Sequence, residues 1–110
     1  ALSQLGNPEF QPWVKAAEKL GKLTGKLYTD TRDFKVTVTG TLQEAEKLMC
    51  AAFSCGIAQS KKRKTNYINA ISLLNEMNIK VCDFWHQIGR ITSHLFVHIV
   101  HSSHFLLLLH

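Results

Sequence analysis

Four consecutive basic residues, followed by two asparagines, form the part of this sequence best suited to bind an anion. The candidate residues are Lys61, Lys62, Arg63, Lys64, Asn66 and Asn69. Ammonium and guanidinium groups beside a helix start can converge on a phosphate or a carboxylate. Such a short basic run is also typical of a solvated turn, or of a nucleic-acid-binding patch whose affinity falls steeply with added salt. We take these six residues as the candidate site for a small anionic effector.

Histidines are concentrated between Phe84 and His110, a segment without acidic residues. On a helix, His94, His98 and His101 would share one face, and three neutral imidazoles can bind zinc or copper. On a strand, His101 would lie on the opposite face from the other two, because side chains alternate along a strand. Carboxylates that could orient the imidazoles are lacking in this segment. We therefore predict no metal site, with a metal-binding histidine trio as the alternative.

Redox chemistry is not predicted by any motif in the chain. A G-x-G-x-x-G loop, which binds the pyrophosphate of NAD in Rossmann folds, is absent from the sequence. Cys50, Cys55 and Cys82 lack the spacing of metal-ligand or iron–sulfur cysteines, and we expect buried thiols. Their odd number, and the lack of a signal peptide at the start, favour a reducing, cytoplasmic environment. We expect no catalytic residue and no cofactor in this chain.

Length and charge limit the remaining classes. With 110 residues, 45% of them hydrophobic, the chain is long enough for a single domain. Its formal net charge of +5 is modest, so we predict no nucleic-acid partner. The apolar run from Phe105 to Leu109 is far shorter than the roughly 20 residues that span a membrane, so we predict no membrane association.

Residues from Pro12 onwards predict an amphipathic helix, because proline suits the first helical position. The predicted apolar stripe consists of Trp13, Ala16, Ala17, Leu20, Leu23 and Leu27. The polar side carries Lys15, Lys19, Lys22 and Lys26. A solvated lysine row is the usual meaning of this pattern, although it could also bind phosphate. Gly21 and Gly25, four residues apart, predict the close approach of another backbone.

The rest of the sequence predicts alternating strands and helices. Residues 34–42 alternate apolar and polar side chains, as a strand does. A second helix is predicted from about Thr41 to Gly56, and residues 64–81 predict a short third helix and a strand. Asn78 suits the helix end, because asparagine tolerates the left-handed conformation. The expected fold is α+β, a small antiparallel sheet with two to three helices packed on one face.

The asparagine-rich stretch resembles a known family signature. Asn66-x-x-Asn69-Ala70, Leu73 or Leu74, Glu76 and Asn78-Ile79-x-Val81 are similar to VNxVNAxxLAxExGIxV. This signature marks the allosteric substrate-binding, or intervening, domain of D-3-phosphoglycerate dehydrogenase, and Asn78 replaces its usual glycine. The N-terminal part is similar to the start of this domain in animal-type enzymes. The similar residues there are Ala1, Leu2, Phe10, Pro12, Trp13, Ala17, Glu18, Leu20, Gly21 and Leu23.

The resemblance covers about residues 1–81 and leaves residues 82–110 as an atypical histidine-rich apolar tail. We expect the C-terminal part of the family domain to be missing or replaced, as an alternative exon or a shifted reading frame would produce. For residues 1–81, the resemblance implies a regulatory and assembly domain of an oligomeric enzyme of L-serine biosynthesis. That enzyme oxidises 3-phosphoglycerate with NAD, which would bind outside this chain.

The resemblance also implies partners and leaves alternatives. The partners would be the rest of the dehydrogenase and its other subunits, together with a small anionic effector. A similar domain occurs in iron–sulfur L-serine dehydratases, although the Pro12-Trp13 opening fits the phosphoglycerate enzyme better. A small histidine-rich metal-binding protein is the second alternative, and zinc or copper retention that depends on His94, His98 and His101 would distinguish it.

Overall fold

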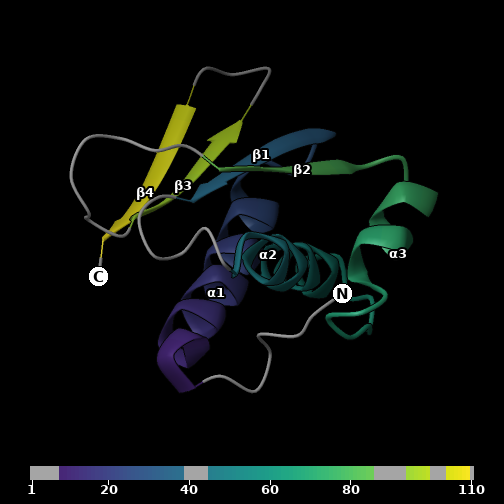
Figure 1. Ribbon diagram of the computed structural model, residues 1–110. Coiled ribbons are helices and arrows are strands. Elements are labelled where there is room, and N and C mark those ends of the chain that lie inside the picture. Colours follow the sequence, from purple (N-terminus) through teal and green to yellow (C-terminus); the bar gives the residue numbers. More distant parts are fainter. Residues whose placement is uncertain (1–7, 39–44, 86–93, 100–103, 110) are drawn as a thin grey trace.

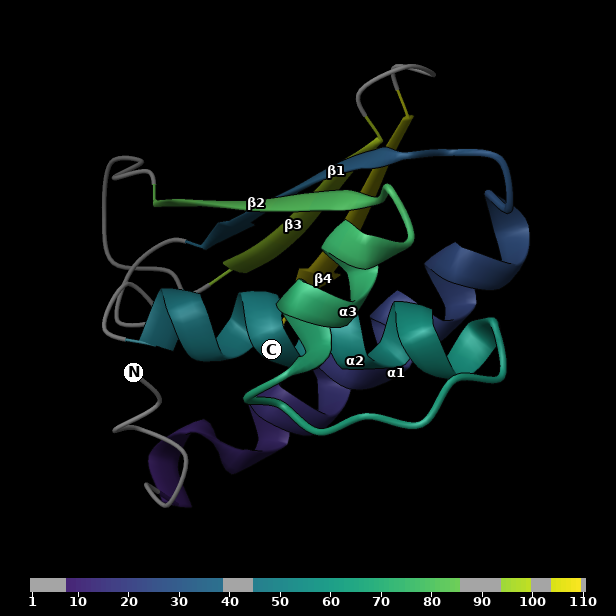
Figure 2. The ribbon, with the colours of Figure 1, turned by 90° about the vertical axis from the view of Figure 1, so that its right-hand side faces the viewer.

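The chain folds as a small sheet with helices on one face, as Figures 1 and 2 show. The computed structural model describes residues 8–38, 45–85, 94–99 and 104–109. Its elements are the 3-10 turn η1 (Pro8–Phe10), α1 (Gln11–Leu27), β1 (Asp33–Val38), α2 (Glu46–Ser60), α3 (Ala70–Glu76), β2 (Lys80–Trp85), β3 (His94–Ile99) and β4 (His104–Leu109). The predicted α+β class is confirmed. None of the helices in these ranges is long and apolar enough to cross a membrane.

The sheet has the strand order β2-β1-β3-β4 and is mixed. β1 pairs antiparallel with β3, and β3 pairs antiparallel with β4. β1 and β2 are parallel, with Phe34 opposite Val81, so the prediction of an antiparallel sheet is wrong for this pair. The reason is the connection: α2 and α3 lie between the two strands and return the chain to the end of the sheet where β1 begins, as a parallel pair requires.

The two long helices, α1 and α2, approach each other closely at glycines. A methyl group added to Gly56 of α2 would overlap the carbonyl oxygen of Glu18 and lie 2.7 Å from the backbone nitrogen of Lys22. One added to Gly21 of α1 would overlap the carbonyl oxygen of Phe53. Backbone atoms cannot move aside as side chains do, so the spacing of these helices depends on the missing side chains.

The buried side of α1 differs from the predicted one. Leu23 is 50% exposed and Leu27 is 60% exposed, so the predicted apolar stripe is wrong at these positions. The buried residues are Trp13, Val14, Ala17, Gly21, Thr24 and Gly25. The predicted close approach of another backbone is confirmed at Gly21, whereas the atoms nearest to Gly25 belong to the side chain of Ser60. Small residues let two backbones form dispersion contacts along the helix, whereas leucines on this side would hold the helices apart.

The second helix forms the centre of the molecule. Every residue from 48 to 58 is buried, because α1, the sheet and α3 surround α2. A helix buried on all sides needs apolar or small residues all round, and this segment supplies them. Its Phe53 packs edge-to-face on Phe34 of β1, with ring centroids 5.8 Å apart. This pair joins the helical layer to the sheet.

Two helices end in the same way, with one residue in the left-handed conformation. Lys62 follows α2 with φ 60° and Asn78 follows α3 with φ 63°. In both turns the residue with positive φ donates its N–H to a carbonyl three residues back, and the next residue donates to one five residues back. This is the Schellman arrangement, which satisfies carbonyls at a helix end. The predicted left-handed Asn78 is confirmed.

Candidate functional site

The basic run of the candidate site forms the end of α2. Lys61 caps the helix, Lys62 adopts the left-handed conformation, and the N–H of Arg63 donates to the carbonyl of Ala58. The Nζ of Lys61 lies 3.3 Å from the carbonyl oxygen of Thr29. Positive charge at a helix C-terminus is favourable, because the helix dipole is negative there. These residues therefore have a structural role, and effector binding by Lys61, Lys62, Arg63 and Lys64 stays a prediction.

The two asparagines of the candidate site form a local turn before α3. The Oδ1 of Asn66 accepts a hydrogen bond of 2.8 Å from the backbone N–H of Asn69, and both residues are exposed. Asparagine commonly bonds the backbone in this way in turns. The turn leads the chain into α3 and accounts for both asparagines without a ligand.

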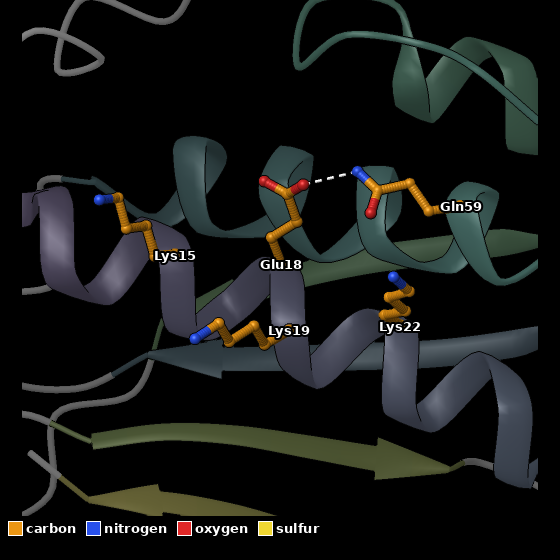
Figure 3. Close-up of a pocket in the computed structure, with 5 residues that line it drawn as sticks. All are labelled: Lys15, Glu18, Lys19, Lys22 and Gln59. Atoms are coloured by element: carbon orange, nitrogen blue, oxygen red, sulfur yellow. Dashed lines mark hydrogen bonds between the residues drawn. The ribbon is translucent and has the colours of Figure 1, made fainter.

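A pocket lies elsewhere, on the side of α1 that faces the last turns of α2 (Figure 3). It has a volume of about 240 Å³ and opens widely to solvent. Its lining residues are Lys15, Glu18, Lys19, Lys22 and Gln59. Three lysines and one glutamate give the lining a formal charge of +2. A pocket with this balance favours an anion over a cation.

Glu18 is the organising residue of the pocket. One of its carboxylate oxygens, Oε2, accepts a 2.5 Å hydrogen bond from the amide of Gln59 in α2. The other, Oε1, accepts a short hydrogen bond from the hydroxyl of Tyr67, which lies in the turn before α3. The carboxylate thereby joins three segments that are distant in the sequence. Two directed donors hold it against α2, as Figure 3 shows for Gln59.

Two groups near Glu18, the hydroxyl of Tyr67 and the thiol of Cys55, have raised pKa values. Burial, the hydrogen bond to Glu18 and the Glu18 charge together raise the pKa of Tyr67. Burial and, after it, the Glu18 charge raise the pKa of Cys55, against a smaller opposite effect of the Gln59 hydrogen bond. Both groups therefore stay protonated at neutral pH. A protonated, buried thiol is a poor nucleophile, so the site does not support cysteine catalysis.

Comparison with known sequence families shows to which family the chain belongs. Residues 9–103 match the family described as the D-3-phosphoglycerate dehydrogenase intervening domain. The chain belongs to this family. The predicted resemblance to an intervening domain is confirmed, and the match continues beyond residue 81 into the histidine-bearing segment. No curated protein sequence matches the chain.

In this intervening domain three of the histidines, His94, His98 and His104, lie in strands. His94 and His98 lie in β3, so the helical face that would group them with His101 does not form over residues 94–99. His101 falls outside the described residues. Among the residues that are described, no group of three or more histidine, cysteine or acidic residues is arranged to hold a metal ion. Cys50 and Cys55 are buried, as predicted, and Cys82 lies in β2.

The pocket of the intervening domain was not the predicted site. The spacing of the lysines in α1 predicts a solvated face, and all four lysines are indeed exposed. Lys15, Lys19 and Lys22 differ from Lys26 because they line a pocket together with Glu18. Hydrogen bonds from Gln59 and Tyr67 hold Glu18 against α2. The signal in the sequence was the single glutamate within a row of lysines. Its partners, 41 and 49 residues away, could not be read from spacing.

Replacing Tyr67 with phenylalanine should lower the free energy of unfolding by about 1–2 kcal/mol at pH 7, because a hydrogen bond to a charged group is lost. The pKa of Tyr67 is raised above its ordinary value of 10.0 in the folded chain. The contribution of this hydrogen bond to the free energy of unfolding is therefore fully present below about pH 10 and is lost as the pH rises through the raised pKa. Urea unfolding of both proteins between pH 7 and pH 11 measures this.

The matched control is Tyr28→Phe, which removes the other tyrosine hydroxyl of the chain. The difference between wild type and Tyr67→Phe should shrink as the pH increases above about 10. A difference that stays constant over the whole pH range would show that the hydroxyl of Tyr67 does not stabilise the fold through Glu18.

Proposed function

We propose that this chain is a regulatory and assembly domain of a D-3-phosphoglycerate dehydrogenase, acting in cytoplasmic L-serine biosynthesis, and that it binds a small anionic effector between α1 and α2. The observation that carries the proposal is the pocket lined by Lys15, Lys19 and Lys22. The family match supports the parent enzyme. The domain itself is non-catalytic in this proposal, and NAD binds to another part of the enzyme.

The chemistry of the pocket supports an anionic ligand. Lysine ammonium groups bind phosphate as point charges, and Lys15, Lys19 and Lys22 lie at spacings that place them on one side of α1. The negative charge of Glu18 is partly offset by Gln59 and Tyr67, which both donate to it. The volume of about 240 Å³ lies below the range typical of drug-sized ligands and suits a small phosphate ester or carboxylate.

Charge removal at two sites separates this proposal from binding at the basic run. The 110-residue chain is titrated at low ionic strength with inorganic phosphate, 3-phosphoglycerate and serine, each in a separate experiment. Calorimetry measures the heat of binding and gives the affinity. Combined Lys15→Ala, Lys19→Ala and Lys22→Ala should weaken anion binding about tenfold or more, because several charge-assisted contacts are lost. Combined Lys61→Ala, Lys62→Ala and Lys64→Ala removes the same charge and should weaken binding only slightly, through the general field.

Three results would count against the proposal. Equal loss of affinity in both triple variants would show that the net charge alone attracts the anion. Loss confined to the Lys61, Lys62 and Lys64 variant would place the effector at the end of α2. Production of NADH by the purified chain with NAD and 3-phosphoglycerate would contradict its non-catalytic character.

A further inference from the structure

The outward side of α1 carries two exposed leucines beside lysines. Leu23 and Leu27 are 50% and 60% exposed and lie one helical turn apart, so they are neighbours on one face. Lys19 precedes Leu23 by one turn, and Lys26 follows it by three residues, and both are exposed. We refer to Lys19, Leu23, Lys26 and Leu27 as the leucine–lysine face. Exposed leucines are common, but adjacent ones on a helix form a contact ridge.

The charged residues of α1 are almost all basic. The helix contains four lysines and one acidic residue, Glu18. Glu18 is held towards α2 by Gln59 and Tyr67, and Figure 3 shows Lys19 extending away from Gln59. The leucine–lysine face therefore presents apolar side chains flanked by positive charge, with no acidic residue of α1 to neutralise it.

We propose that the leucine–lysine face docks an acidic amphipathic helix from another domain or subunit. Leucines at i and i+4 match the ridge spacing of a helix laid against α1, and Lys19 and Lys26, which lie on one side of this ridge, would pair with acidic side chains on the facing edge of that helix. Complementary charge of this kind sets the partner and its orientation more than the affinity. Lys19 belongs to both the leucine–lysine face and the anion pocket, whereas Leu23 and Leu27 do not line the pocket, and the proposal does not rest on effector binding.

Two other occupants fit the face less well. A symmetric pair of copies would bring the same patch together, and Lys19 and Lys26 would meet lysines of the other copy. A membrane surface would need a broad apolar face, whereas the buried side of α1 is packed on α2 and only Leu23 and Leu27 remain as large exposed apolar side chains on this helix. An acidic amphipathic helix would both pack on the two leucines and pair with the lysines.

The proposal is tested by measuring the binding of a synthetic peptide to the 110-residue chain. The probe is a fluorescently labelled helix of about 20 residues with leucine at i, i+4 and i+7 positions and glutamate on the flanks. Fluorescence anisotropy should show saturable binding that weakens as salt is added. A peptide with lysine in place of each glutamate is the charge control, and vesicles of neutral and anionic phospholipid test the membrane.

The double variant Leu23→Ser, Leu27→Ser should reduce peptide affinity about tenfold or more, because the contact ridge is lost. Ile68→Ser, at a leucine-sized side chain that is 75% exposed outside α1, should leave peptide affinity unchanged. Binding of inorganic phosphate by the double variant should equal that of wild type, which separates this face from the pocket. Equal binding of the lysine peptide, an unaffected double variant, or attachment to anionic vesicles in place of the peptide would overturn the proposal.

Discussion

Replacing Gly56 with alanine should destabilise the chain by about 3 kcal/mol, at the upper end of overpacking costs. An exposed helical glycine behaves in the opposite way, since alanine there adds about 1 kcal/mol of helix stability. The methyl group that this substitution adds would overlap the carbonyl oxygen of Glu18 and approach the backbone nitrogen of Lys22. The two helices would have to separate, which would also open the core around α2. Urea unfolding followed by circular dichroism measures the loss.

Gly25 supplies the matched control for this contact. A methyl group there would overlap the hydroxyl oxygen of Ser60, a side-chain atom, and would lie 3.4 Å from the Cα of Ile57. Gly25→Ala should therefore cost less than Gly56→Ala, and the cost should fall further when Ser60 is replaced by glycine in a double-mutant cycle. Equal effects of alanine at Gly25 and Gly56, or a stabilising Gly56→Ala, would contradict a backbone contact between α1 and α2.

Truncating Phe53 to alanine should lower the free energy of unfolding by about 3–5 kcal/mol. The side chain is 0% exposed and packs edge-to-face on Phe34, so its removal leaves a cavity between the helices and the sheet. Phe53→Leu keeps most of the volume and should cost less, about 1 kcal/mol. Thermal and urea unfolding of the three proteins give the values.

The control for Phe53 is Leu23→Ala, in the neighbouring helix. Half of the Leu23 side chain is already exposed, so its truncation should change stability by about 0.5 kcal/mol or less. Similar losses for Phe53→Ala and Leu23→Ala would mean that α2 is not the centre of the core.

Local patterns in the sequence were enough to predict several elements. Phe34 and Val36 alternate with polar neighbours, and both are buried in β1 as a half-buried strand requires. Asn78 has the left-handed backbone expected of a residue that replaces glycine at a helix end. These predictions depend only on residues close together in the chain.

Features that depend on distant residues could not be predicted. Hydrophobicity assigned Leu23 and Leu27 to the buried side of α1, but Gly56 of α2 lies directly against the backbone of α1, so the small residues of α1 face α2 instead. The parallel pairing of β1 with β2 depends on how α2 and α3 return the chain. The pocket depends on Gln59 and Tyr67, which reach Glu18 only after the three segments have packed.

The central place of β1 has a consequence for synthesis of the protein. Both strands that pair with β1 come later in the sequence. β1 ends at Val38, whereas β2 begins at Lys80 and β3 begins at His94. As the chain leaves the ribosome, β1 therefore emerges with both edges unpaired and stays so until its partners are made. Unpaired strand edges promote aggregation of nascent chains. We expect chains truncated between α2 and β2 to recruit chaperones, whereas chains long enough to include β2 have one edge of β1 protected.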